Sequence, residues 1–386
     1  MLTRRALLIT GGASVVVVGA AATAINTTQL GRTARSPWLA IQQTFSDARL
    51  NVLSHAILAP SPHNRQPWRV RLDEDAETFS LFVDRERLLP KTDPYNRQIV
   101  VGLGAFIETA SIAATAFGYS LEVQPFPDGE NAEALDDRVV AHLRLHRESG
   151  RASDPLFTSI PARRTNRLPF DRERPVTIDS LRQMQSLAGI SEARFGADSS
   201  SAGVAALKAL CQQAWHVEST TAETHAESVR LTRIGAAEIA DNPDGISIGG
   251  VLPSALGKVG ILTRETLLDT ESTAFSGMVD FYNQAIESAS AFAWITSADN
   301  SRQSQLRAGA DWLRLHLAAT QLGIAFHPLS QALQEFEEMA VHYRDIHEML
   351  GVSSPAVVQG LFRLGYADAP DPAPRWALES RIETLG

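Results

Sequence analysis

A repeated pattern constrains the fold of this 386-residue chain more than any other feature. Two segments, residues 97–119 and 302–324, carry the same series of identities at a constant offset of 205. The eight identical pairs are Arg97/Arg302, Gln98/Gln303, Gly104/Gly309, Ala105/Ala310, Ala113/Ala318, Ala114/Ala319, Thr115/Thr320 and Gly118/Gly323. Chance gives one or two such identities, but eight at one offset indicate an internal duplication.

Each copy of the pattern predicts one helix followed by one strand. Small and apolar residues recur at helical spacing, and Gly118 and Gly323 stand where a glycine would end the helix. A short β-like run follows each of these glycines. We therefore expect an α+β protein with two related halves, residues 36–150 and 151–386. Packed about a pseudo-twofold axis, the halves would imitate a homodimer within one chain.

One stretch of the second half has no counterpart in the first. Residues 241–256 are rich in glycine, proline and serine, and they open a segment that runs to about residue 290. Long insertions in compact domains are often binding loops or lids, so we expect this segment to be a lid. Residues 37–58 have the apolar spacing of one amphipathic helix, and residues 202–240 are expected to be helical.

The N-terminal 35 residues differ from the rest of the chain. Arg4 and Arg5 precede a stretch from Ala6 to Ile25 that contains no charged residue. A cationic start with an apolar run is typical of a secretory signal, and adjacent arginines are typical of the twin-arginine export signal. We expect export by that route to the periplasm or cell envelope. A membrane anchor is the alternative, because the run is just long enough to span a bilayer.

Composition excludes several classes of function. Lys+Arg number 35 and Asp+Glu 44, so the net charge is −9, whereas nucleic-acid binding needs a positive surface. Cys211 is the only cysteine, which excludes an intrachain disulfide, a cysteine-only metal site and a dithiol redox pair. His142 and His146 lie in a strand-like run where their spacing does not favour a metal, and we expect no metal site. Any redox chemistry must use something other than thiols.

Two segments carry unusual chemistry for their length. Residues 59–68, Ala-Pro-Ser-Pro-His-Asn-Arg-Gln-Pro-Trp, place a hydroxyl, an imidazole and amides in a proline-stiffened turn, which suits hydrogen bonding to a planar heterocycle. Residues 163–167, Arg-Arg-Thr-Asn-Arg, supply three guanidinium groups that suit a phosphate. Composition alone favours plainer interpretations, namely a stiff turn with Trp68 in the core and a solvated basic loop.

Together the two segments resemble the nitroreductase family of FMN-dependent oxidoreductases. Ala-Pro-Ser-x2-Asn-x-Gln-Pro-Trp before a strand is a specific signature of that family, and Arg-Arg-[Ser/Thr]-x-Arg is its usual flavin motif. Residues 322–331 resemble the family segment that passes beside the flavin ring. The resemblance covers nearly everything after residue 36 and implies a nitroreductase-like fold. With the export signal and the duplication, the order of motifs indicates the Acg-type branch.

This order of motifs differs from that of a typical nitroreductase. There the Arg-Arg motif precedes the Ala-Pro-Ser motif in one short chain, and two chains form two FMN sites at their interface. Here the first half holds only Ala-Pro-Ser and the second half only Arg-Arg-Thr, while the segment at the matching offset, residues 264–273, lacks the first motif. The resemblance therefore implies one complete FMN site between the halves of one chain, which we expect to act as a monomer.

The resemblance also gives each matching residue a role. Those expected to hold the FMN phosphate, ribityl chain and pyrimidine edge are Arg163, Arg164, Thr165 and Arg167. Those expected to line the other side of the ring are Pro60, Ser61, Pro62, His63 and Asn64. Those expected near flavin N5 through backbone atoms are Pro328, Leu329, Ser330 and Gln331, although many family members have Glu-Gly at the last two positions. Arg375, after a proline-rich tail, would add to phosphate binding.

The resemblance implies an enzyme in which the flavin, and no side chain, is the reactive group. We expect hydride transfer through flavin N5 to a nitro compound, a quinone or a similar acceptor. Members of the family usually take electrons from NAD(P)H, but NAD(P)H is scarce outside the cytoplasm, so export would leave the donor open. The alternative is a catalytically silent protein that binds or sequesters FMN beneath the insertion. A scaffold that has lost flavin altogether is a third, less favoured possibility.

Overall fold

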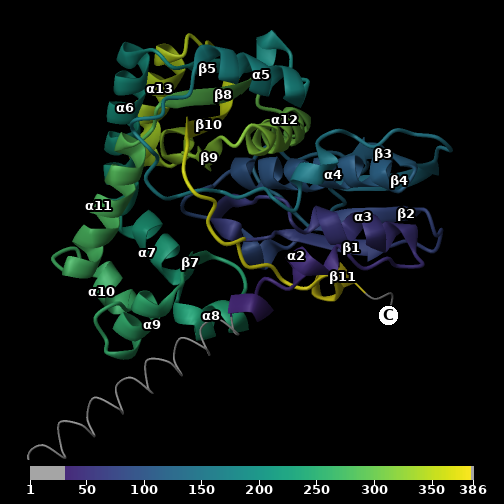
Figure 1. The fold of residues 1–386 in the computed structure, drawn as a ribbon, viewed down its shortest axis with the longest axis horizontal. Coiled ribbons are helices and arrows are strands. Elements are labelled where there is room, and N and C mark those ends of the chain that lie inside the picture. Colours follow the sequence, from purple (N-terminus) through teal and green to yellow (C-terminus); the bar gives the residue numbers. More distant parts are fainter. Residues whose placement is uncertain (1–30, 384–386) are drawn as a thin grey trace, which may run out of the picture.

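The computed structural model describes residues 31–383, which form a mixed α and β structure (Figure 1). The first half begins with two short helices and a β-hairpin, followed by a long helix and two further strands. Their bounds are α2 (Pro37–Ala40), α3 (Ala48–Ala56), β1 (Trp68–Leu72), β2 (Thr78–Val83), α4 (Arg97–Ala116), β3 (Tyr119–Pro125) and β4 (Ala141–Arg147).

The second half repeats this order with additions. Its matching elements are α5 (Ile178–Ala188), β5 (Phe195–Asp198), β8 (Ala291–Ser297), α12 (Arg302–Gln321), β9 (Ala325–Pro328) and β10 (Val357–Gly365). A further helix, α13 (Ala340–Met349), stands between β9 and β10, and the short strand β11 (Ile382–Glu383) ends the described chain.

The two main sheets share one topology. The first has the strand order β11-β1-β2-β4-β3 and the second has the order β5-β8-β10-β9. All neighbouring strands are antiparallel except β11, which pairs with β1 in parallel. In Figure 1 the two sheets lie on either side of the paired helices α4 and α12. The predicted α+β fold with two related halves is therefore confirmed.

The repeated glycines mark the crossing of α4 and α12. A Cβ atom on Gly104 would lie 2.1 Å from the carbonyl oxygen of Leu306, and one on Gly309 would lie 2.0 Å from that of Val101. Leu306 holds the position in the second copy that Val101 holds in the first, so these two contacts are equivalent. The helices thus meet backbone to backbone at a point that only glycine permits, as two subunits do in a symmetric interface.

The repeated arginines make reciprocal contacts across the same interface. Arg97 at the start of α4 is buried and donates to the carbonyl oxygen of Leu333, while its Nε lies 3.0 Å from a carboxylate oxygen of Glu335. Arg302 at the start of α12 is equally buried and donates to the carbonyl oxygen of Asn131 at 2.9 Å. Each half therefore holds the loop that follows β3 or β9 in the other half.

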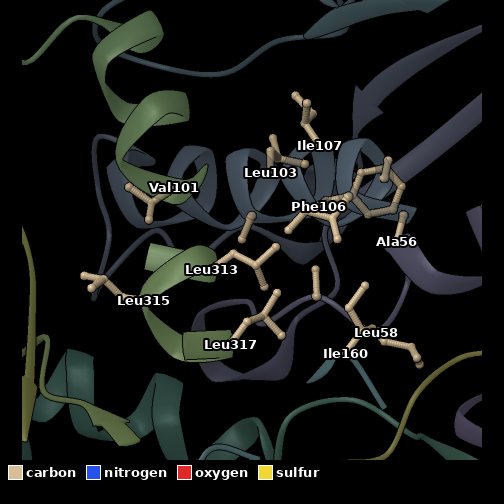
Figure 2. Close-up of a cluster of buried hydrophobic side chains, with 14 of the residues drawn as sticks. Ala56, Leu58, Val101, Leu103, Phe106, Ile107, Ile160, Leu313, Leu315 and Leu317 are labelled. Atoms are coloured by element: carbon tan, nitrogen blue, oxygen red, sulfur yellow. The ribbon is translucent and has the colours of Figure 1, made fainter. Parts of the chain in front are cut away.

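An apolar core fills the space around the two helices (Figure 2). Its members include Val101, Leu103, Phe106 and Ile107 of α4, Leu313, Leu315 and Leu317 of α12, and Ala56, Leu58 and Ile160 from neighbouring segments. Among the described residues, α4 alone has the length and apolar composition of a membrane span, but most of that helix is buried. The burial identifies α4 as the central helix of the core.

The connection from β5 to β8 is much longer than the equivalent turn from β1 to β2. It contains α6 (Ser201–Thr220), α7 (Ala222–Arg230), β6 (Thr232–Ile234), α8 (Gly235–Asp241), β7 (Ile246–Ile248), α9 (Val251–Lys258), α10 (Arg264–Leu268) and α11 (Thr273–Glu287). We call residues 199–290 the insertion. The insertion begins well before the expected residue 241. The expectation placed its start too late because the helical spacing after residue 202 does not distinguish these helices from the repeated elements.

The single helix expected over residues 37–58 is wrong, and the helical stretch expected over residues 202–240 is interrupted. Residues 37–58 form α2 and α3, because the Asp47 carboxylate accepts a hydrogen bond from the Arg49 N–H and starts a new helix there. Residues 202–240 form α6, α7, β6 and α8, with an extended backbone at Thr221 between the first two helices. In both cases local capping and extended residues divide a continuous apolar pattern.

The topology also corrects where a second Ala-Pro-Ser motif would stand. Residues 59–67 lie between α3 and β1, so their equivalent is the connection from α5 to β5 at residues 189–194. Residues 264–273, the segment at the matching offset, lie instead in the insertion. The true equivalent reads Gly-Ile-Ser-Glu-Ala-Arg and also lacks the motif.

Candidate functional site

Residues 59–68 form a turn of unusual backbone geometry between α3 and β1. His63, Asn64 and Gln66 have φ angles of 47°, 52° and 51°, in the left-handed region that residues other than glycine rarely adopt. The Ser61 hydroxyl oxygen accepts a hydrogen bond from the Gln66 N–H at 2.9 Å. Such backbone strain persists only where the surroundings enforce it, and it clusters at binding sites.

The C-terminal tail of the second half holds this turn in place. The side-chain nitrogen of Asn64 donates to the Pro374 carbonyl oxygen at 3.1 Å, and its side-chain oxygen accepts from Arg375 at 2.5 Å. The Trp376 N–H donates to the side-chain oxygen of Gln66 at 2.9 Å. On the opposite side α4 supports the turn, since a Cβ on its Gly102 would lie 3.1 Å from Pro62.

Three arginines gather around the ring of Trp38 on α2. The guanidinium carbons of Arg163, Arg164 and Arg375 lie 5.8, 5.0 and 5.4 Å from the centre of that ring. Two of them belong to the Arg-Arg-Thr motif and the third to the tail. We call these three residues the arginine cluster. Contacts between guanidinium groups and an aromatic face are stabilising, but they leave the three positive charges in place.

The partners of the arginine cluster are neutral. Arg163 donates to the carbonyl oxygen of Leu58 at 3.0 Å, and Arg375 donates to the same oxygen at 3.1 Å. Arg164 donates to neighbouring carbonyl oxygens, although the charge of Asp371 acts on it. Within residues 31–383, no carboxylate forms an ion pair with any of the three. The cluster therefore keeps an excess of positive charge.

Burial makes the uncompensated positive charge of Arg163 and Arg375 unfavourable. Arg163 and Arg375 are each 3% exposed. Burial, followed by the charge of Arg164, lowers the pKa of Arg163 to about 9, and burial with both neighbouring charges holds the pKa of Arg375 well below its usual value. One nitrogen of Arg163, Nη1, is buried and has no hydrogen-bond partner in the described part of the chain. Buried cations require a compensating anion, so this donor set fits a phosphate group.

The remainder of the Arg-Arg-Thr motif runs beside β9. Thr165 forms a parallel bridge with Phe326, whose carbonyl oxygen accepts from the Asn166 N–H at 3.0 Å. Arg167 is exposed to solvent, yet the surrounding protein atoms desolvate its guanidinium group and lower its pKa. The charge of Arg167 also reaches His63 in the strained turn. The motif therefore lies between β9 and the turn.

The imidazole of His63 is neutral at physiological pH and is therefore available to a ligand as an uncharged group. Burial, followed by the charges of Arg65 and Arg167, lowers the pKa of its imidazole to about 4. Its Nδ1 atom is buried, and no residue in the described range 31–383 forms a hydrogen bond with it. A neutral ring nitrogen without a protein partner, next to two of the predicted cofactor segments, suits a hydrogen bond to a bound heterocycle.

The third predicted segment, residues 328–331, follows β9. The Leu329 side chain is packed into an apolar core, so only its backbone remains for a ligand. Pro328 and Ser330 are half-buried. The side-chain nitrogen of Gln331 donates to the Tyr282 hydroxyl oxygen at 3.0 Å. The structure thus joins the turn, the arginine cluster and the tail directly, and the bridge from Thr165 to Phe326 joins the Arg-Arg-Thr motif to β9, which leads into residues 328–331.

Polar residues that no motif indicated border this region. Glu218 of α6 is buried, and its carboxylate accepts from the Gln334 side chain at 3.1 Å. Burial outweighs these hydrogen bonds and raises the pKa of Glu218 to about 7. The sequence held one signal, because Glu218 follows Cys211 and Trp215 on the apolar side of a predicted helix, where a charged residue is unexpected.

One carboxylate ties the insertion to the strained turn. The two oxygens of Asp244 lie 2.7 Å from Arg233 and 2.7 Å from Arg87, and Arg65 lies 3.5 Å away. Burial alone would raise the pKa of Asp244, but the hydrogen bond and charge of Arg233 with the charges of Arg87 and Arg65 lower it. We call Asp244 and these three arginines the insertion latch.

The insertion latch yields a stability prediction. Asp244→Asn should lower the free energy of unfolding at neutral pH by about 1.5–3 kcal/mol, because hydrogen bonds to a charged group are lost. Because the folded protein lowers the pKa of Asp244, ionised Asp244 stabilises the fold at pH values above the unfolded pKa of 3.8. The difference in stability between wild type and Asp244→Asn should therefore shrink as the pH falls below 3.8. Denaturant unfolding at pH 7 and pH 3 measures this. Asp179→Asn, at an exposed pair with Arg182, is the control and should change little. Equal stability of wild type and Asp244→Asn at pH 7 would refute the latch.

Other candidates offer no site. An open recess of about 370 Å³ within the insertion is lined by residues such as Glu238, Lys258 and Arg264, and by none of the predicted cofactor residues. Within residues 31–383, no group of His, Cys, Asp and Glu side chains has the arrangement of a metal site. Cys211 is buried, and burial raises the pKa of its thiol to about 12.

Comparison with known proteins identifies relatives of part of the chain. An uncharacterised protein of Mycobacterium tuberculosis H37Rv, Rv3127, is 35% identical over 130 residues, which are 31% of this chain and 35% of that protein. The acg protein of the same strain, named as a candidate NAD(P)H nitroreductase, is 34% identical over 132 residues, 32% of this chain and 36% of that protein. The match thus spans about a third of these relatives. The acg protein bears the name of the family that the motifs of this chain resemble. No family model matches the chain.

Solved structures give a weaker likeness. The FMN-dependent nitroreductase NfnB of Mycobacterium smegmatis, solved in complex with NADPH, is 20% identical, with a TM-score of 0.35 over 59% of this chain and 96% of that one. A candidate nitroreductase of Anabaena variabilis is 12% identical, with a TM-score of 0.41 over 86% of this chain and 91% of that one. Both TM-scores are below 0.5, so neither structure bears on the fold or the site.

Proposed function

We propose that this chain is an FMN-dependent oxidoreductase of the nitroreductase type, with one flavin site between its two halves. The observation that supports this most is the arginine cluster, of which Arg163 and Arg375 are buried. It combines one motif of the second half with the tail and has no carboxylate partner among the described residues. A flavin phosphate would supply the missing negative charge. The adjoining strained turn comes from the first half, so a ligand at this place would contact both halves.

In this proposal, Arg163, Arg164 and Arg375 hold the FMN phosphate, while Thr165 and Arg167 hold the ribityl chain and the pyrimidine edge. Pro60, Ser61, Pro62, His63 and Asn64 line the other side of the ring, and Pro328, Leu329, Ser330 and Gln331 approach it from β9. Bound FMN supplies hydride transfer at N5. His63, neutral at physiological pH, adds a hydrogen-bonding atom without adding charge. The positive charge of Arg167 favours electron density on a nearby ring.

The acceptor in this proposal is a nitro compound, a quinone or a similar small molecule, and the donor is NAD(P)H. A catalytically silent protein that sequesters FMN is the second candidate. The insertion latch favours it, because four charged groups and a hydrogen bond from Gln66 to Pro243 fix the insertion against the turn. An insertion held in this way would restrict access to the flavin.

The visible spectrum of the purified protein separates these candidates. We expect a yellow protein with flavin absorbance that bleaches with NADPH under anaerobic conditions and returns on addition of a nitroaromatic compound or a quinone. Flavin absorbance that NADPH leaves unchanged would favour the silent flavin-binding protein. A colourless preparation that does not take up added FMN would refute both.

The repeat has an evolutionary interpretation in this proposal. A gene duplication joined two nitroreductase-like halves, after which each half lost the motif that the other keeps. The equivalent contacts of Gly104 and Gly309 support this interpretation. The chain would then bind its flavin as a monomer.

The proposed place of action is the periplasm or cell envelope, reached by twin-arginine export. The motif that carries this proposal, Arg4 and Arg5, lies outside the described residues. Changing both arginines to lysine should leave the protein in the cytoplasm, because the export route recognises the arginine pair. Cell fractionation with immunoblotting measures this, and Arg32→Lys, beyond the apolar run, is the matched control. Unchanged export of the double variant would remove the proposal.

A further inference from the structure

Glu218 of the insertion forms hydrogen bonds with residues 331–334, and its carboxylate determines which group donates in each of them. An ionised carboxylate can only accept. Accordingly Glu218 accepts from the Gln334 side chain at 3.1 Å and from the Ser228 hydroxyl at 3.4 Å. Gln331 also forms a hydrogen bond with Glu218, and it must do so through its amide nitrogen, because its amide oxygen cannot donate.

The same amide nitrogen of Gln331 bonds to Tyr282. The distance from Gln331 Nε2 to the Tyr282 hydroxyl oxygen is 3.0 Å, so the amide donates and the hydroxyl oxygen accepts. The hydroxyl proton of Tyr282 is then left to be donated elsewhere, and no residue in the described range accepts it. Burial and the charge of Glu218 raise the pKa of Tyr282, so this proton stays on the oxygen at physiological pH.

The Tyr282 ring packs against β9, the strand that leads into residues 328–331. The ring stacks on Trp215 with centroids 4.4 Å apart, and it meets His327 of β9 edge-on at 5.8 Å. The charge of Arg167 acts on Tyr282 and also on His63 in the strained turn. A hydrogen-bond donor from the insertion therefore lies near the same arginine as the neutral imidazole from the first half.

We propose that the Tyr282 hydroxyl donates a hydrogen bond to an oxygen atom of the electron acceptor, and that Glu218 and Gln331 are positioning residues that keep the hydroxyl in its donating direction. The inference rests on the proposed function, because it requires the acceptor to lie beside the flavin. In this inference the insertion contributes to substrate specificity. The protein binds nitro compounds and quinones, which have oxygen atoms that accept the hydrogen bond, more tightly than hydrocarbons of the same shape.

Protonation of Glu218 should weaken this arrangement. A protonated carboxyl has lost its charge and donates through one oxygen, so the hydrogen bond that orients the Gln331 amide becomes weaker. The charged or titratable groups around the cluster are Glu227 of α7, Arg363 of β10, Arg167 and His327. Because Glu218 has a pKa of about 7, nitro-compound binding should fall as the pH is lowered from 8 to 6.

Binding to the oxidised, full-length holoprotein without an electron donor tests the proposal. Nitrobenzene is titrated while the visible flavin absorbance is followed, and toluene serves as the ligand of similar shape without oxygen. Tyr282→Phe should bind nitrobenzene about three- to tenfold more weakly, the effect of one neutral hydrogen bond, and should bind toluene as wild type does. Tyr95→Phe, at an exposed tyrosine, should bind both ligands as wild type does.

Glu218→Gln tests the positioning role separately. The variant should bind nitrobenzene between pH 6 and 8 with no pH dependence, at the weaker level that wild type shows at pH 6. Equal nitrobenzene binding by wild type and Tyr282→Phe, or an equal loss of nitrobenzene and toluene, overturns the inference while the flavin content still supports the proposed function. A wild-type protein that binds no flavin overturns both.

Discussion

Alanine in place of Gly309 should destabilise the protein by about 2–4 kcal/mol, because the added Cβ overpacks the crossing of α4 and α12. That atom would lie 2.0 Å from the Val101 carbonyl oxygen and 2.9 Å from the Cα of Gly104, and neither backbone atom can move without separating the helices. Gly104→Ala should be about as harmful, because its Cβ would lie 2.1 Å from the Leu306 carbonyl oxygen. Denaturant unfolding measures both changes in free energy.

Gly277 provides the matched control for these substitutions. It lies inside α11, and a Cβ there would meet no atom within 4 Å. Because alanine has a higher helix propensity than glycine, Gly277→Ala should raise the stability by about 0.5–1 kcal/mol. The opposite signs at Gly277 and Gly309 separate contact between the halves from helix propensity. A stabilising effect of Gly309→Ala would refute the close crossing.

Alanine in place of Arg164 should weaken FMN binding about ten- to hundredfold, because a charge-assisted phosphate contact contributes about 1.5–3 kcal/mol. Arg164 suits this test better than Arg163 or Arg375, since within the described chain its own hydrogen bonds reach only the carbonyl oxygens of Pro161 and Arg163. Its removal should leave the fold intact. Titration of the apoprotein with FMN, followed by quenching of flavin fluorescence, measures the dissociation constant.

Two further variants calibrate this measurement. Ser61→Ala removes a neutral hydroxyl from the opposite half and should weaken the same site by a smaller factor, about two- to tenfold. Arg182→Ala removes an exposed arginine that pairs with Asp179 on α5, and it should bind FMN as wild type does. Wild-type affinity in Arg164→Ala would show that the arginine cluster does not hold the phosphate.

Much of the fold followed from the sequence because the duplication is visible in residues with backbone roles. Gly104 and Gly309 permit the helix crossing, while Arg97 and Arg302 hold loops across it. Such positions tolerate few replacements, so both copies keep them. Element boundaries were less accessible, because caps such as Asp47 divide apolar patterns that look continuous. The start of the insertion at residue 199 was not predicted, because the helical spacing after residue 202 resembles that of the repeated elements.

The sequence indicated which segments form the candidate site, but it did not indicate which side chains contact one another there. The turn and the arginine motif are contiguous, and each carries its own chemistry. Glu218 and Tyr282 lie in different helices of the insertion and meet residues 331–334 only through the folded structure. Nor does a sequence tell which way a side chain points, and the Leu329 side chain points into the core. Likewise, the missing carboxylate partners of the arginine cluster become visible only in three dimensions.

The ratio of FMN to protein in a monomeric preparation tests the central claim most directly. The mass of the species is fixed by light scattering during size-exclusion chromatography, and FMN is titrated into that fraction until the flavin spectrum stops changing. Because each half keeps one part of the site, we expect one FMN per chain in the monomer. Two FMN per chain, or binding that occurs only in a dimer, would contradict a single site shared between the fused halves.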